Sequence, residues 1–203
     1  MAGAKRTGDS VRDRMFRAAI ELFAKKGYPG TTIRDIVQKA DVTQPMVYYY
    51  FGNKEQLFIT CIREINRRIN AAYENLDPEK PFKSFMRDFM KANRDAFDEI
   101  PEAMFLIARL AFSPDEFPEI PEMKEIIRKP LLTLMKAFDN AKKRAEITTK
   151  ISSWQFAPMV FGGFAFTAIS EHLRDRFEIP VSRRAKPKTE DLAKVFIEGV
   201  VKK

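Results

Sequence analysis

Apolar residues recur every three to four positions along most of the chain, and no segment shows sustained alternation of apolar and polar residues. Because this spacing brings apolar side chains to one face of a helix, the pattern predicts an all-α fold. A first helix is expected to begin after Ser10, where Asp13 favours a capping box, and to end at Gly27. Its predicted buried stripe consists of Val11, Met15, Ala18, Ala19, Leu22 and Phe23.

Two short helices are predicted next. Thr32, with Asp35 three residues later, favours the start of a second helix. Thr43 is placed to cap a third helix, and Pro45 is tolerated in its first turn because no N–H donor is needed there. Residues 32–50 are therefore expected to form a helix, a three-residue turn and a second helix. This spacing lays one helix across a DNA backbone and puts the next into the major groove.

A longer helix and a second helical region follow. Asn53 with Gln56 is typical of a helix start, and this fourth helix is expected to reach about Leu76, before Asp77-Pro78. The helices expected beyond Pro81 are Phe82–Phe97, Ala103–Phe112, Met123–Arg144, Ser152–Phe177 and Thr189–Val201.

Composition narrows the function classes. The net charge is +8, and residues 1–56 carry ten Lys/Arg against six Asp/Glu, a surplus of four, which favours a polyanionic partner. A single cysteine and a single histidine argue against a disulfide framework and a Cys/His metal cluster, and favour a reducing, cytoplasmic interior. With no Gly-rich phosphate loop and no nucleophile–histidine pairing, neither an enzyme nor a bound cofactor or metal is expected.

One segment could be mistaken for a membrane span. Residues 151–170 are uncharged, but their apolar part covers only 156–169. A bilayer span needs about 20 strongly apolar residues, so a buried helix is the better interpretation and no membrane partner is expected.

An ordered succession of motifs adds a family resemblance. It consists of Phe23–Tyr28 (FAKKGY), Thr31–Ile36 (TTIRDI), Val47–Phe51 (VYYYF) and Asn53–Glu55 (NKE). In this order they closely resemble the DNA-binding domain of TetR-family transcriptional regulators, over about residues 10–57. The resemblance implies a helix-turn-helix domain at 1–56, continued by a linking helix at 53–76, and a helical ligand-binding and dimerisation domain at 57–203.

The resemblance also implies roles at the start of the recognition helix. Thr32 would cap its helix and touch a phosphate, and the Thr43 hydroxyl is similarly placed. Gln44 and Pro45 would meet base edges, where glutamine can pair with adenine and a proline ring can pack on a thymine methyl. Met46 stands where the family is variable, and would contact a thymine methyl or nothing. Alternatively, both threonines only cap helices and Gln44 only faces solvent.

Three further residues are expected at the DNA backbone. Tyr48 and Tyr49 correspond to the family's aromatic positions that reach the sugar-phosphate chain. Lys54, at the start of the fourth helix, would meet a phosphate with help from the helix dipole, unless it simply pairs with a carboxylate. Tyr50 and Phe51 are predicted to be core residues.

The C-terminal region offers candidates for an effector site. Eighteen Phe and nine Met favour a large, adaptable apolar interior. The candidate lining residues are Phe89, Phe105, Arg109, Trp154 and Phe161, although each aromatic one could equally be core. Arg109, in an otherwise apolar segment, would hold a carboxylate or phosphate, or form a structural salt bridge. Fatty acids, acyl thioesters and cationic aromatic drugs are the effector classes that suit an aromatic-rich pocket.

The expected function is that of a ligand-responsive transcriptional repressor. A homodimer, formed through the helix with Gly162-Gly163 and the final helix, would present two recognition helices about 34 Å apart to a near-palindromic operator in double-stranded DNA. A small, largely apolar effector would release it. An activator would have the same sequence features, and the rival class is a nonspecific or architectural DNA-binding protein without an effector.

Overall fold

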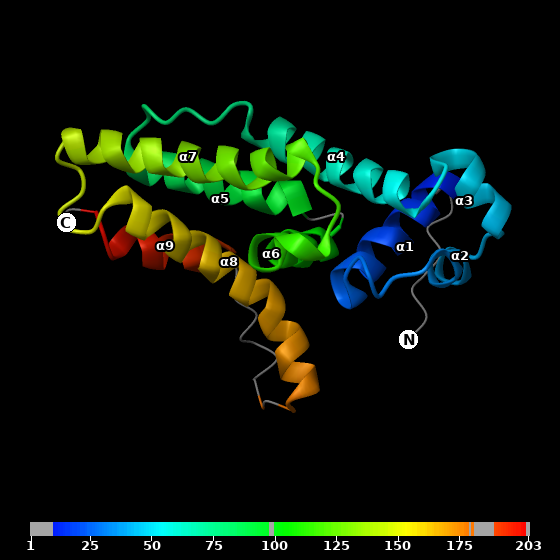
Figure 1. The fold of residues 1–203 in the computed structure, drawn as a ribbon. Coiled ribbons are helices and arrows are strands. Elements are labelled where there is room, and N and C mark those ends of the chain that lie inside the picture. The colour runs from blue at the N-terminus through cyan, green and yellow to red at the C-terminus, as the bar shows by residue number, and fades with distance from the viewer. Residues whose placement is uncertain (1–9, 98–99, 179, 181–188, 202–203) are drawn as a thin grey trace.

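The computed structural model describes residues 10–97, 100–178, 180 and 189–201 (Figure 1), with the side chains of 165, 167–176 and 189–193 outside that description. The described helices are α1 (Val11–Lys26), α2 (Ile33–Ala40), α3 (Gln44–Phe51), α4 (Lys54–Tyr73), α5 (Phe82–Phe97), α6 (Glu102–Phe112), α7 (Pro121–Lys143), α8 (Ser153–Arg176) and α9 (Thr189–Glu198), with a short 3-10 turn at Pro114–Glu116. Among these residues the only β-pairing is an isolated bridge between Ile147 and Val201. The all-α prediction is confirmed.

Local capping sets the ends of α1. The Ser10 hydroxyl accepts a hydrogen bond from the Asp13 backbone N–H at 3.1 Å, and the Asp13 carboxylate accepts one from the Ser10 N–H. At the other end Gly27 has φ +75°, a conformation that favours glycine. The buried Thr31 hydroxyl closes this end by donating to the carbonyl oxygens of Leu22 and Gly27, at 3.1 and 2.7 Å.

The N-terminal helices α1, α2 and α3 form a compact group at one end of the molecule (Figure 1). Two ion pairs fasten α1 to the second helix: Lys26 lies 3.0 Å from Asp35, and Lys39 lies 2.6 Å from Glu21. The Arg14 side chain also donates to the Ala40 carbonyl at the C-terminal end of α2. Paired charges and a capped helix end hold α2 at a fixed angle on α1, which in turn positions α3.

Helix α4 joins this group to the C-terminal helices. Its Phe58 ring is fully buried and lies 5.1 Å from the Phe23 and Tyr28 rings on one side and 5.5 Å from Phe117 on the other. Aromatic pairs at such distances add to the stabilisation from burial. The two halves therefore share a continuous core at Phe58.

The C-terminal region is a layered helical bundle. Helices α5 and α7 run alongside α4, α6 lies between this layer and α1, and α8 packs on α7 before extending away from the body (Figure 1). Its core contains a chain of phenylalanine rings, with Phe138 stacked on Phe156 at 4.6 Å and Phe82 edge-on to Phe138 at 5.8 Å. The helices lie where the sequence predicts them, although α4 ends at Tyr73 rather than near Leu76. Within the described part of the chain, no helix is long and apolar enough to cross a bilayer.

Candidate nucleic-acid interface and ligand cavity

Helix α3 exposes most of its side chains. Only Val47 and Phe51, one helical turn apart, are buried against the other helices. Tyr49 is 84% exposed and Tyr48 is 48% exposed, while the other sequence-predicted DNA contacts in α3 are also at the surface: Gln44, Pro45 and Met46. A helix whose only function was to complete the core would not present so many aromatic and amide groups to solvent, so this face has the character of a contact surface.

The exposed side chains of α3 are arranged in pairs. The Gln44 amide donates a hydrogen bond to the Tyr48 hydroxyl at 3.2 Å, which places these two side chains together on one face. Tyr49 lies edge-on to Tyr50 with ring centroids 5.1 Å apart. The prediction that Tyr50 belongs to the core is wrong, because its side chain is exposed. On a helix of eight residues the face that meets the core is narrow, and Val47 and Phe51 fill it.

The two threonines before α2 and α3 differ. The Thr32 hydroxyl accepts a hydrogen bond from the Asp35 N–H at 3.1 Å and donates one to the Asp35 carboxylate at 2.8 Å. The backbone N–H of Thr32, with Lys26 and the Thr32 hydroxyl, lowers the pKa of Asp35 to about 2. Thr43 occupies the capping position of α3, but its hydroxyl makes no capping hydrogen bond, contrary to prediction.

Lys54 lies at the start of α4, beside the DNA-binding helices. Its ammonium nitrogen is 4.2 Å from the centre of the Tyr28 ring, a cation–π geometry, and burial lowers the pKa of Lys54. Asn53 caps the same helix by accepting a hydrogen bond from the Gln56 N–H at 2.8 Å. The aromatic contact and the capped helix end restrict where the Lys54 charge can lie. A positive charge there is suited to a phosphate of DNA.

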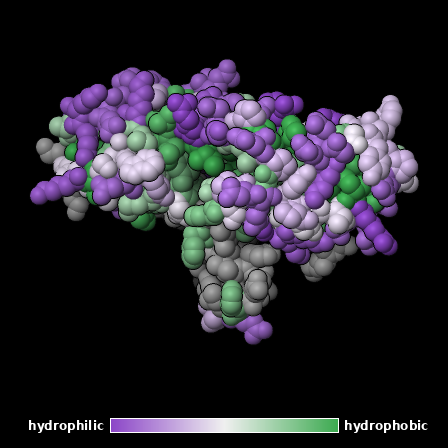
Figure 2. Space-filling view, in the orientation of Figure 1, coloured by the Kyte–Doolittle hydropathy of each residue, from purple (hydrophilic) through white to green (hydrophobic). Residues whose placement is uncertain are grey.

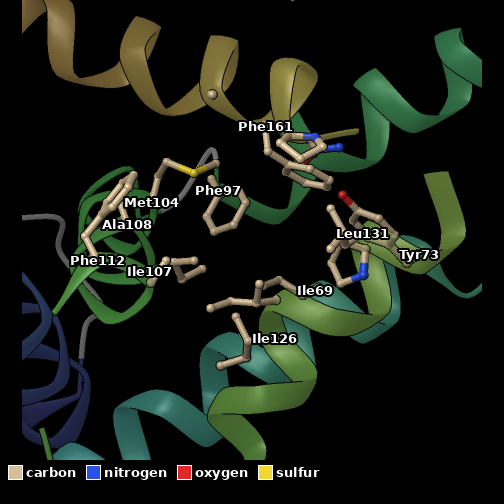
Figure 3. A pocket seen from close by; sticks show the side chains of 16 residues that line it. Ile69, Tyr73, Phe97, Met104, Ile107, Ala108, Phe112, Ile126, Leu131 and Phe161 are labelled. Carbon is tan, nitrogen blue, oxygen red and sulfur yellow. The ribbon is translucent and has the colours of Figure 1, made fainter. Parts of the chain in front are cut away.

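A cavity of about 280 Å³ lies within the C-terminal bundle (Figure 3). Sixteen residues line it, drawn from α4, α5, α6, α7 and α8. The polar lining side chains are Tyr73 of α4 and Asn93 of α5, and the other fourteen residues are apolar. Phe112, at the end of α6, lines the cavity and is also 85% exposed to solvent. Such a mostly apolar concavity with few polar groups is typical of small-molecule sites.

Of the residues predicted to line an effector site, Phe161 lines this cavity (Figure 3). Phe89 is fully buried behind it, with its ring 5.8 Å from Phe161 and 5.5 Å from Tyr73. Phe105 is half-buried against the core, and Trp154 is 63% exposed on α8; neither is among the cavity-lining residues. The lining residues Tyr73 and Asn93 were not predicted.

Arg109 lies on α6 but faces the N-terminal helices. Its guanidinium donates to the Glu116 carboxylate at 2.9 Å, the salt-bridge alternative predicted for it. The same group packs against the end of α1, because a Cβ atom at Gly27 would lie only 2.8 Å from the Arg109 Nη2 atom. A helix that lines the cavity is thus also in close contact with the DNA-binding end.

The comparisons with known proteins agree with this arrangement. A family model described as bacterial regulatory proteins, tetR family, matches residues 16–61. The chain is 33% identical over 105 residues to the HTH-type transcriptional repressor NicS of Pseudomonas putida, covering 49% of this chain and 48% of NicS. It is 30% identical over 103 residues to the HTH-type transcriptional regulator RutR of Escherichia coli, covering 48% of this chain and 47% of RutR.

Solved structures share the whole fold. The hemolysin II transcriptional regulator HlyIIR superposes with a TM-score of 0.65 at 17% identity, over 95% of this chain and 98% of that one. A TetR-like regulator from Rhodococcus sp. RHA1 gives a TM-score of 0.66 at 18% identity, over 95% of each chain.

The family match identifies residues 16–61 as a DNA-binding region like that of tetR-family bacterial regulatory proteins, and the solved structures show that the chain as a whole shares their fold. Residues 16–61 belong to the tetR family of bacterial regulatory proteins. The matched region spans about half the length of curated relatives such as NicS and RutR.

Proposed function

We propose that this protein is a ligand-responsive transcriptional repressor that binds a near-palindromic operator as a homodimer and is released by a small, largely apolar effector. In this proposal residues 1–56 form the DNA-binding domain, α4 links it to the rest, and residues 57–203 bind the effector and form the dimer. The repressor assignment follows the similarity to NicS, which is itself named a repressor.

The exposed face of α3 is the observation that carries the DNA-binding role. Gln44 and Pro45 stand at its exposed start, and Tyr48 and Tyr49 project from its surface. In the complex Gln44 would read a base edge in the major groove, since a glutamine amide can pair with adenine. The tyrosines would contact the sugar-phosphate backbone, and Lys54 would neutralise a phosphate. Met46, at the same surface, would contact a thymine methyl.

Apolar side chains on α8 support a dimer. Met159 and Phe166 are more than half exposed, as is Val195 of α9. Figure 2 shows apolar surface where α8 leaves the helical body. Large exposed apolar side chains gathered on neighbouring helices favour a protein partner, and a second copy would bury the same residues on both sides of a two-fold axis. Two recognition helices related by such an axis would read a near-palindrome.

The position of the cavity supports a response to a ligand. Its lining includes α4, which begins at the DNA-binding helices, and α6, which contacts α1 through Arg109. A ligand that prefers one arrangement of these helices would shift the population toward it. Operator affinity would then change only by the difference in the ligand's affinity for the two arrangements.

Selection of sheared genomic DNA on the purified protein, followed by sequencing of the retained fragments, tests this function. The proposal predicts that retained fragments share a near-palindrome and that its half-sites are about one helical turn apart. Retention without a shared motif, lost smoothly as salt rises, would instead identify a nonspecific or architectural DNA-binding protein. If the fragments do share a motif, the expression of the genes beside it, measured with and without the protein, shows whether binding represses or activates them.

A further inference from the structure

The lining of the cavity carries a chemical signature of its own. Among the described residues that line it, no lysine, arginine, histidine, aspartate or glutamate occurs. Its walls are mostly side chains such as Ile69, Phe97, Ile107 and Leu131, which surround the central space in Figure 3. A charged group that entered such a space would lose its hydration without gaining a counter-charge, which is costly.

The polar groups are concentrated at one corner, where α4 and α5 meet. Tyr73 and Asn93 are both buried, and both line the cavity. Burial raises the pKa of Tyr73, and the nearby Asn93 side chain offsets only part of that effect, so the phenol stays neutral. The Asn93 amide donates a hydrogen bond to the Phe89 carbonyl at 2.8 Å.

This corner keeps hydrogen-bonding capacity for a ligand. A phenol has one O–H donor, and an asparagine side chain has one carbonyl oxygen with two lone pairs. Because the Asn93 amide nitrogen donates to the Phe89 carbonyl, the groups that can meet a ligand are the Tyr73 O–H, which can donate to a ligand oxygen, and the Asn93 oxygen, which can accept from a ligand hydroxyl. In Figure 3 the Tyr73 hydroxyl points toward Phe161, inside the circle of lining residues.

We infer that the effector of this protein is an electrically neutral, largely apolar molecule with one hydroxyl or carbonyl group, and that Tyr73 and Asn93 hold this group. The inference rests on the proposed function and deepens it. It narrows the effector classes expected from composition, since a fatty acid carboxylate or a cationic drug would enter without a counter-charge.

Four probes of nearly the same shape test the inference: 2-naphthylmethanol, 2-naphthoate, 2-naphthylmethylammonium and 2-methylnaphthalene. Their binding to the full chain at pH 7, without DNA, can be followed by naphthalene fluorescence and by calorimetry. The two charged probes should bind about a hundredfold more weakly than the alcohol, or more weakly still, because their charges are buried unpaired. The alcohol should bind more tightly than 2-methylnaphthalene.

Three variants assign the effect to this corner. Tyr73→Phe keeps the ring and removes the hydroxyl. It should therefore lower the affinity for the alcohol by about fivefold to tenfold and change the affinity for 2-methylnaphthalene by no more than about twofold. Tyr28→Phe, the same change near the DNA-binding end, should leave both affinities unchanged. Ala108→Phe, which fills the cavity beside α6, should abolish saturable binding of both neutral probes.

Several outcomes would overturn the inference. The first is that the charged probes bind as tightly as the alcohol, and the second is that neither neutral probe shows saturable binding. The third is that Tyr73→Phe lowers the affinity for the alcohol and for 2-methylnaphthalene equally. The fourth is that the alcohol still binds to Ala108→Phe. Because these measurements use no DNA, their failure would leave the operator selection untouched. Failure of that selection would equally leave the ligand class standing.

Discussion

The two halves of this protein carry their candidate sites in different ways. The DNA-facing site is contained in a run of about twenty residues, and its helix α3 contacts the core through only Val47 and Phe51. The cavity is assembled from five helices that begin as far apart in sequence as α4 and α8. A site on one exposed helix can be altered with little effect on folding, whereas a site made by packing cannot be separated from the core.

The largest expected effect comes from breaking the core that the two halves share. Phe58→Ala should lower the free energy of unfolding by about 3–5 kcal/mol, because it empties a fully buried position with aromatic neighbours on both sides. Chemical denaturation measures this directly. Phe112→Ala, the same change at an exposed position, should cost no more than about 0.5 kcal/mol. Equal losses in the two variants would contradict a shared core at Phe58.

A second variant separates DNA affinity from stability. Lys54→Met should weaken binding to every duplex by about tenfold, and should lower the slope of log affinity against log salt by about 2 in a dimer, because each protomer loses one phosphate contact. Salt titrations by fluorescence anisotropy give both quantities. Lys136→Met removes the same charge from an exposed site on α7 and should leave the slope unchanged. A slope that stays constant in Lys54→Met would exclude the phosphate contact.

The two helix-capping threonines provide a smaller, matched comparison. Thr32→Ala should destabilise the protein by about 1 kcal/mol, because its hydroxyl caps α2. Thr43→Ala should cost less, because the Thr43 hydroxyl makes no capping bond. Any loss of DNA affinity in Thr43→Ala without loss of stability would mark that hydroxyl as a phosphate contact. Thermal unfolding of both variants checks the order, and equal destabilisation would contradict the capping difference.

The smallest effect is a pH dependence from Asp35. The folded-state pKa of this carboxyl is lowered from 3.8 to about 2 by the Thr32 backbone N–H, Lys26 and the Thr32 hydroxyl. A lowered pKa contributes stability that is present above the unfolded value and is lost as the pH falls through the folded value. Stability should therefore decline between about pH 4 and pH 2, and less steeply in Asp35→Asn. Acid unfolding curves that are parallel for the two proteins would contradict this contribution.

The contrast between the halves also explains what the sequence could predict. Helix ends depend on neighbours three or four residues away, so the capping at Ser10, Thr32 and Asn53 could be predicted. The exposure of Tyr50 depends on how wide a face α3 presents to α2 and α4, which is a tertiary property. For the same reason the structure places Phe161 at the cavity but turns Arg109 away from it, toward Glu116 and Gly27.

The sequence of α5 does carry one signal for the cavity. Asn93 continues the buried stripe of α5 that contains Phe85 and Phe89, each four residues before the next. A polar side chain in register with core positions needs a hydrogen-bond partner, and such groups often mark a ligand site. Tyr73, the other polar lining residue, comes from α4, twenty residues earlier, and no local pattern connects the two.

The most direct test of DNA reading by α3 is the affinity of Gln44→Ala for the selected operator and for a scrambled duplex of the same length. Each lost base contact should cost about 1–3 kcal/mol on the operator, while affinity for the scrambled duplex and stability should stay the same. An equal loss on both duplexes, or no loss on either, would contradict base reading by this helix.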